Sequence, residues 1–297
     1  MKRWLVRAVW AAVLIFSTAV AGGALDARHR LSDLDSWHRY VRADATASDL
    51  SDSTTLADYL QREDAVFRDV HDRIERSSTG SAAPPANRYD PRSRSYAQRV
   101  GSDWNRTHEI VPDGEITGGA LLVHGLTDSP YSMRAAAEAL KARGYYSLAL
   151  RMPGHGTVPA GLTTAVWEDW LAAVRVGVRR VRRRIGPAKP LVLVGYSNGG
   201  ALVLKYALDG LEHGDPSPPS RLVLMSPRIG VAPFAWMARV TSLLAPIPYF
   251  EKAGWLDVIP EYTRSSTTRF PRMPRCNRGG SPPMCRRRCF GSEKPAA

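Results

Sequence analysis

Short apolar runs alternate with helical patterns through the middle of the chain. Four runs have the length and the β-branched content of buried strands: 118–123, 145–150, 191–194 and 222–225. Helical stretches at about 131–143, 167–185 and 200–211 separate them. Parallel strands joined by helices need right-handed crossovers, which leave both faces of the sheet covered. The pattern therefore predicts an α/β fold with a mostly parallel, doubly wound sheet.

The chain begins with a basic end followed by an uncharged stretch. Lys2, Arg3 and Arg7 precede the apolar residues 8–25, which include a small-x-small cleavage pattern at 19–21. Segment 1–25 is therefore predicted to be a signal peptide or an N-terminal membrane anchor. Because positive flanks stay in the cytoplasm, we expect the rest of the chain to be exported, in a periplasmic or other extracytoplasmic location, with residues 8–25 able to anchor it to the inner membrane. A buried N-terminal helix is the alternative.

Residues 26–102 are polar and predict a helical stalk followed by a linker. One apolar stripe at helical spacing follows a start rich in Ser and Thr: Leu56, Leu60, Phe67, Val70 and Ile74. This helix either packs against the following domain or stands off as a stalk. The sequence after it is rich in Pro, Ser and Arg, which is typical of a linker. We expect the α/β domain to occupy 103–262.

Much of the formal net charge of +13 lies at the C-terminal end. Residues 263–297 hold eight arginines and Lys294 against the single acid Glu293. An arginine-rich face within 167–185 predicts a solvated helix surface whose cations offset the helix dipole. Because no nucleic-acid-binding module accompanies these charges, we expect no nucleic-acid partner. The three cysteines, Cys276, Cys285 and Cys289, match no standard metal or redox spacing.

A Gly-x-Ser-x-Gly pentapeptide, residues 195–199, joins the third apolar run to the next helix. In such a turn the serine has a strained backbone, which is tolerated only where its glycine neighbours lack side chains. Ser197 would then stand at the carboxyl end of a parallel sheet. We expect the amides of Ser197 and Asn198, at the N-terminus of the following helix, to face a developing oxyanion.

Three motifs in this order resemble the α/β-hydrolase fold, in its esterase, monoacylglycerol lipase and lysophospholipase-like branch. They are His124-Gly125, Pro153-Gly154-His155-Gly156 and the serine pentapeptide, and the resemblance covers about 104–262. It implies that Ser197 is the nucleophile of a serine esterase or lipase and that the backbone amides of Leu126 and Asn198 form its oxyanion hole. It also implies a hydrophobic acyl-ester substrate and no metal or organic cofactor. His124 and His155 would support loops rather than act as the base, because the fold orders its triad serine, acid, histidine.

The apolar and aromatic residues 228–262 follow the last predicted strand. Their position above the expected active site predicts a cap over an acyl-binding pocket. A plain crossover helix is the alternative.

The triad acid and histidine are expected to be absent from this chain. After Ser197 the only histidine is His213, which lies in the loop behind the serine helix, on the side of the sheet away from the carboxyl ends. Asp209, Asp215 and Asp257 all precede the place where the family has its acid. A serine without a positioned base is a weak nucleophile, so we expect little turnover. The alternatives are a peptidase or thioesterase on the same fold, or a non-catalytic, membrane-tethered binding protein.

Residues 263–297 lack apolar periodicity and resemble no part of the family. Such a composition cannot build a core. Back-translation of 263–271 in the frame one nucleotide earlier permits Asp or Asn followed by Pro-Phe-Lys-Tyr-Asn-Ser-Phe-Pro, which resembles the segment after the cap in relatives. We therefore expect a frameshift near 263, a disordered basic tail and missing last strands, with an unpaired sheet edge that favours aggregation. A genuine disordered tail is the alternative.

Overall fold

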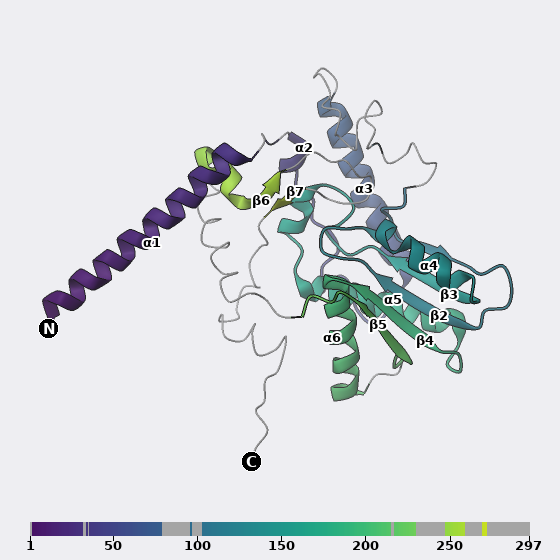
Figure 1. Ribbon diagram of the computed structural model, residues 1–297. Helices are drawn as coiled ribbons and strands as arrows, with labels where there is room; N and C mark the ends of the chain where they lie inside the picture. Colours follow the sequence, from purple (N-terminus) through teal and green to yellow (C-terminus); the bar gives the residue numbers. More distant parts are fainter. Residues whose placement is uncertain are drawn as a thin grey trace, which may run out of the picture.

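The computed structural model describes residues 2–31, 34, 36–78, 96, 103–214, 217–229, 247–258 and 269–271. Within these residues one five-stranded sheet has the order β1-β3-β2-β4-β5 (Figure 1). Its strands are β1 (His108–Ile110), β2 (Gly118–Val123), β3 (Tyr145–Leu150), β4 (Leu191–Tyr196) and β5 (Arg221–Met225). The last four are parallel, as predicted, whereas β1 is an antiparallel edge strand that the sequence patterns did not indicate.

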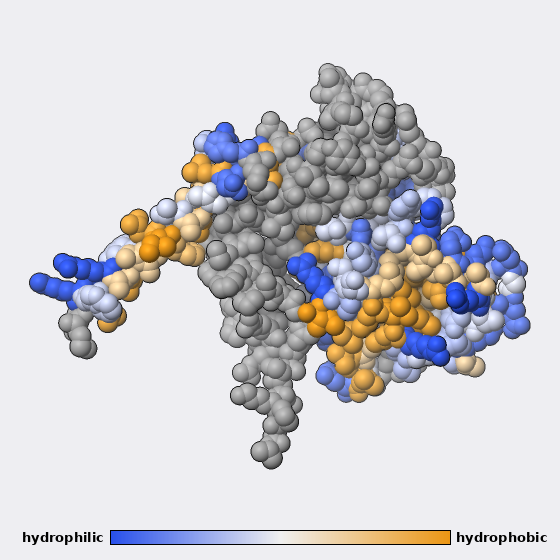
Figure 2. Space-filling model, in the orientation of Figure 1, coloured by the Kyte–Doolittle hydropathy of each residue, from blue (hydrophilic) through white to orange (hydrophobic). Residues whose placement is uncertain are grey.

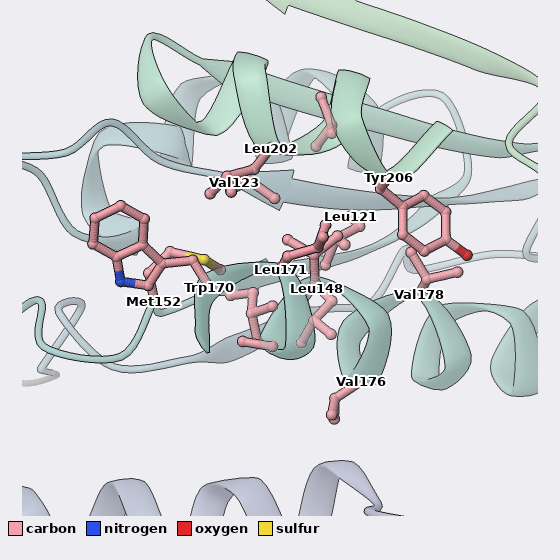
Figure 3. Packing of buried hydrophobic residues seen from close by; sticks show 14 of the residues in the cluster. Leu121, Val123, Leu148, Met152, Trp170, Leu171, Val176, Val178, Leu202 and Tyr206 are labelled. Atoms are coloured by element: carbon pink, nitrogen blue, oxygen red, sulfur yellow. The ribbon is translucent and has the colours of Figure 1, made fainter. Parts of the chain in front are cut away.

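Helices cover both faces of the sheet. They are α4 (Arg134–Lys141), α5 (Trp167–Ile185) and α6 (Asn198–His213), with the short 3-10 helices η2 (Pro130–Met133) and η3 (Pro159–Thr163). Side chains of β2 alternate between the faces, as strand geometry requires. Leu121 and Val123 belong to the larger core under α5 and α6, while Ala120 and Leu122 pack on the side of α4. Figure 3 shows Leu121 and Leu148 of the sheet among Leu171, Leu202 and Tyr206 from these two helices.

The carboxyl ends of the parallel strands meet at one edge of the sheet. Val123 of β2 pairs with Leu150 of β3 and with Gly195 of β4, and Tyr196 pairs with Met225 of β5. The loops after β2, β3, β4 and β5 therefore leave the sheet side by side. In open α/β sheets such an edge is where ligands bind.

Helix α3 (Leu56–Ser78) packs against the domain, so of the two arrangements considered for the 56–74 stripe the structure has the packed one. Leu56 and Tyr59 join the larger core, and Val66, Val70 and Ile74 cluster with Val158. The loop before α3 also contacts the arginine face of α5, where Arg179 Nη2 donates to the carbonyls of Ser51 (2.9 Å) and Thr54 (3.2 Å). That face is thus partly covered, in contrast to the solvated surface that its charge pattern predicts.

The N-terminal helix α1 (Lys2–Arg30) is exposed over its apolar half. It is the one helix, among the described residues, that is long and apolar enough to cross a membrane. Figure 2 shows it projecting from the rest of the chain, with its basic end outermost. Its other end packs on the 3-10 helix η5 (Pro248–Gly254), where Arg28 lies 3.9 Å from the ring of Tyr249 and Lys252 Nζ donates to the Leu31 carbonyl (2.8 Å). The short helix α2 (Ser36–Arg39) follows.

Part of the predicted tail has a regular structure. Strand β7 (Arg269–Pro271) pairs antiparallel with β6 (Trp255–Val258), so these three residues are ordered rather than part of a disordered tail. Backbone hydrogen bonding to β6 accounts for their extended form, which composition does not reveal. Residues 259–268 and 272–297, the three cysteines, and 230–246 of the predicted cap lie outside the described residues.

We predict that a charged side chain on the edge strand β5 reduces aggregation of the protein. Within the described residues β5 is paired on one side only, and Val223 is 43% exposed. Figure 2 shows apolar colours over β5 and α6. Unpaired apolar edges recruit further strands, and lysine blocks this pairing. Val223→Lys should raise the concentration at which light scattering detects aggregates.

Leu208→Lys is the matched control, because Leu208 is 44% exposed but lies on α6. An equal gain from both variants would mean that general surface hydrophobicity, and not the strand edge, causes the association.

Candidate functional site

The turn between β4 and α6 has the strained form that the pentapeptide predicts. Ser197 has φ 51° and ψ −113°, a region that L-residues rarely adopt. A Cβ on Gly195 would lie 2.4 Å from the Gly199 carbonyl oxygen, and one on Gly199 would lie 2.2 Å from that of Val123. Any side chain at either position would therefore force the strand and the helix apart.

Strand β5 and the residues after it hold Ser197 in this conformation. The Ser197 N–H donates to the carbonyl of Met225 (2.9 Å), and its own carbonyl accepts from the N–H groups of Arg228 (2.9 Å) and Gly200 (3.0 Å). The expectation that the Ser197 amide faces an oxyanion is wrong. This N–H already donates to the carbonyl of Met225, at the end of β5. Asn198 then supplies the first free amide of the helix.

The two predicted oxyanion donors lie on loops that meet at the sheet edge. Asn198 is the first residue of α6, where backbone N–H groups have no intrahelical acceptor. Leu126 follows β2, and the first turn of α6 touches the end of that strand, since a Cβ on Gly199 would lie 2.6 Å from the His124 carbonyl oxygen. Gly125 in turn lies against the Tyr196 ring. In the described part of the chain, neither amide donates a backbone hydrogen bond outside regular secondary structure.

His124 is a structural link between two loops. Its Nδ1 bonds to the Gly125 carbonyl (2.8 Å), and its Nε2 accepts from the Met152 N–H (3.1 Å). This pattern requires a neutral ring with the proton on Nδ1. Burial, with a smaller effect from His155, holds the pKa of His124 well below its usual value. The imidazole therefore fixes the carbonyl that directly precedes Leu126.

His155 is buried beside it and is bonded to the backbone of its own loop. Its Nδ1 bonds to the Pro153 carbonyl (3.0 Å), and its ring packs edge-on against His124 (5.0 Å between centroids) and Trp170 (5.4 Å). Burial lowers the pKa of His155 to about 4. Both histidines thus have the loop-supporting positions that the family resemblance implies.

The remaining triad candidates lie far from the turn or outside the described residues. His213 is exposed at the other end of α6, bonded through Nδ1 to the Asp209 carbonyl (3.0 Å). The helix has 16 residues, so at 1.5 Å per residue its ends are about 24 Å apart. Asp209 forms ion pairs with Lys205 and Arg175. Asp215 and the side chain of Asp257 are not described.

Sequence patterns missed a buried charge cluster behind the β3 loop. The Arg151 side chain is fully buried and forms an ion pair with Asp44, whose side chain is 5% exposed. Burial alone would lower the pKa of Arg151, but the charges of Asp44 and Glu63 raise it further than burial lowers it. No pattern in the sequence marks this pair, because its members lie more than a hundred positions apart.

A family model described as serine aminopeptidase, S33 (Hydrolase_4), matches residues 114–263, half of the chain. The match includes Ser197, Leu126, Asn198 and the parallel strands. The chain belongs to this family. Its fold is therefore the α/β-hydrolase fold of a serine hydrolase family, with the sheet order and serine turn described above.

Two curated proteins are similar to parts of this chain. A thermostable monoacylglycerol lipase from Bacillus sp. (strain H-257) is 38% identical over 89 residues, which are 30% of this chain and 34% of the lipase. The magnesium-chelatase 30 kDa subunit of Rhodobacter capsulatus is 32% identical over 134 residues, which are 43% of this chain and 42% of that protein. The chain thus spans about a third to two fifths of the length of these relatives.

Solved structures give the same kind of partial match. A structure of the metagenome-derived lipolytic enzymes LipS and LipT is 28% identical, with a TM-score of 0.39 and coverage of 46% of this chain and 51% of that one. The monoacylglycerol lipase of Paleococcus ferrophilus is 21% identical, with a TM-score of 0.37 and coverage of 48% and 51%.

We predict that the free energy of unfolding falls as the pH drops from about 6.5 to about 4. His155 binds its proton near pH 4 when folded but near pH 6.5 when unfolded, so the unfolded chain binds more protons across this window. The loss approaches about 1.4 kcal/mol per pH unit, or about 3 kcal/mol in all for His155. Urea unfolding in detergent at pH 7.5, 5.5 and 4.5 measures it.

His155→Leu should make this pH dependence less steep, whereas His213→Leu, at an exposed histidine, should not. Equal slopes for the parent and His155→Leu would contradict the assignment of a buried neutral imidazole.

Proposed function

We propose that the protein is a carboxylic ester hydrolase that acts through an acyl-Ser197 intermediate. The observation that carries this proposal is the strained turn at Ser197, held by Met225 and Arg228 at the N-terminus of α6. Such strain is retained where it serves chemistry. It places the half-buried Ser197 at the carboxyl edge of the sheet, beside the first amide of a helix.

In this reaction Ser197 Oγ attacks the ester carbonyl and the carbonyl oxygen becomes an oxyanion. The N–H groups of Leu126 and Asn198 stabilise this oxyanion, and the loss of one such donor costs about 3 kcal/mol. The alcohol then leaves with a proton, and water releases the acid from the serine. Proton transfer needs a base; His124 and His155 are buried and bond backbone carbonyls through Nδ1, and His213 lies at the far end of α6.

A hydrophobic acyl ester is the substrate class that we propose. Support comes from the similarity to a monoacylglycerol lipase over 89 residues and from the apolar surroundings of the site, with half-buried Leu126 and exposed Tyr196 beside the serine. We further propose that the chain is exported and held at the membrane by α1. The packing of the inner end of α1 on η5 would then place η5, within the predicted cap, close to the lipid surface.

We predict that the 297-residue chain hydrolyses p-nitrophenyl butyrate hardly above the background rate. Removal of the base in subtilisin costs about a millionfold in kcat. At pH 9, where hydroxide can replace the base, p-nitrophenyl acetate should slowly add one acetyl group to the protein. Intact-mass and peptide mass spectrometry should place that group on Ser197.

Ser197→Ala should remove the adduct and Ser132→Ala, at an exposed serine, should leave it unchanged. Turnover at ordinary enzyme rates would contradict the missing base, and the lack of an adduct in the parent would contradict the acyl-Ser197 mechanism and favour a non-catalytic binding protein. The family model is described as a serine aminopeptidase, so the substrate panel includes aminoacyl p-nitroanilides. Faster acylation by these amides than by matched esters would favour a peptidase.

We also propose that the coding sequence shifts frame near residue 263 and that the triad acid and histidine are encoded in the neighbouring frame. Sequencing the DNA from about codon 255 onward tests this. An open neighbouring frame should encode a strand that ends in Asp and then a later His. Early stop codons in both other frames would contradict the frameshift.

A further inference from the structure

The buried carboxylate of Asp44 joins the N-terminal segment to the loop after β3. Its Oδ2 accepts from the Gly154 N–H (2.9 Å) and pairs with Arg151 Nη2, and its Oδ1 accepts from the Ala45 N–H (2.8 Å). Burial raises the pKa of Asp44, but Arg151 and these hydrogen bonds lower it below its usual value. Asp44 is therefore ionised, and both of its carboxylate oxygens have hydrogen-bond partners. It has no part in the proposed catalytic steps. It lies outside residues 114–263, which the family model matches.

Arg151 connects Asp44 to the backbone of the loop after β3. Its Nε donates to the His155 carbonyl (2.6 Å), so one guanidinium bridges Asp44 and the far end of the turn. Other residues of the N-terminal part fix the same backbone: the Tyr59 hydroxyl donates to the Arg151 carbonyl (2.5 Å), and Thr107, which is bound by Glu63, accepts from the Arg151 N–H (2.9 Å). Residues 151–155 are thus held from outside the matched domain.

The loop after β3 holds the loop after β2 through the two histidines. The Met152 N–H donates to His124 Nε2, and His124 Nδ1 bonds to the Gly125 carbonyl. His155 packs edge-on against His124. The Gly125 carbonyl and the Leu126 N–H belong to the same peptide group, so hydrogen bonds and the Arg151–Met152 backbone link Asp44 through His124 to that donor.

A second link runs beside the first. Gly156 has φ 73°, and a Cβ there would lie 2.8 Å from the Asn105 carbonyl oxygen. The side chain of Asn105 accepts from Ser129 Oγ (2.6 Å), three residues beyond Leu126. Asn105 therefore packs against Gly156 and hydrogen-bonds to Ser129, so it lies between the two loops.

We propose that Asp44, together with Arg151, is a positioning residue that sets the place of the Leu126 amide in the oxyanion hole. This inference rests on the proposed ester hydrolysis at Ser197. A carboxylate of the N-terminal segment would then support the geometry of the active site without touching the substrate.

Two variants and one control test the proposal in the full chain in detergent. Asp44→Asn keeps the shape and removes the charge that faces Arg151. Arg151→Lys keeps the charge and removes the bridge to the His155 carbonyl, and it carries the test if Asp44→Asn does not fold. Asp49→Asn is the control, because Asp49 lies in the same segment, with Thr46 and Arg62 as its partners.

Two measurements are made on each variant: amide hydrogen exchange of the peptides that contain 124–130, and the rate of Ser197 acetylation at pH 9 at saturating and at low p-nitrophenyl acetate. We expect faster exchange confined to 124–130 and 151–156. Because a misplaced group about 1 Å away can cost about a hundredfold, we expect a 10- to 100-fold lower maximal acetylation rate, with the half-saturating ester concentration unchanged. Asp49→Asn should behave as the parent.

Unchanged exchange at 124–130 in a folded variant would overturn the proposal, as would faster exchange spread evenly over the domain or an unchanged acetylation rate. If the parent forms no adduct, the proposed function fails, while the exchange data still decide whether Asp44 positions the Leu126 loop.

Discussion

The close approach of β4 and α6 is the constraint on which the rest of the site depends. A Cβ on Gly195 of β4 would lie 2.4 Å from the Gly199 carbonyl oxygen of α6, so strand and helix come too close for a side chain. This forces Ser197 into a positive φ, and the strain persists because β5 binds the serine at both its N–H and its carbonyl. Hydrogen bonds from the parallel sheet thus keep Ser197 in this conformation at its carboxyl edge.

The second constraint is the cost of burying a charge. Arg151 has no exposed surface, and a lone buried guanidinium would be strongly unfavourable. Asp44 and Glu63 make its burial possible, and both come from the segment before the matched domain. Removing one partner of such a pair commonly costs about 3–5 kcal/mol, because the other charge stays buried. The N-terminal segment is therefore integral to the hydrolase domain, and the notion of a detached stalk does not describe residues 44–74.

The two arrangements together fix the Ser197 side of the candidate site. The turn at Ser197 is fixed by close packing at its glycines. The loops around Leu126 are fixed by the buried histidines and the Arg151 cluster. His213, in contrast, lies at the far end of α6 and is bound to its own helix. Preorganised backbone donors can stabilise an oxyanion without a base, but they cannot remove the serine proton.

The sequence by itself determined the four parallel strands, their helices, the strained serine turn and the exposed apolar helix at the N-terminus. These features depend on local periodicity and on glycine at fixed offsets, which are readable without long-range information. Only the tertiary structure decided that β5 takes the Ser197 amide, that α3 packs on the domain, that Arg269–Pro271 is a strand, and that Asp44 meets Arg151. Each of these depends on groups distant in sequence. Their contacts are set by how the layers pack and by the need to pair buried charges and backbone donors, which no pattern along the chain records.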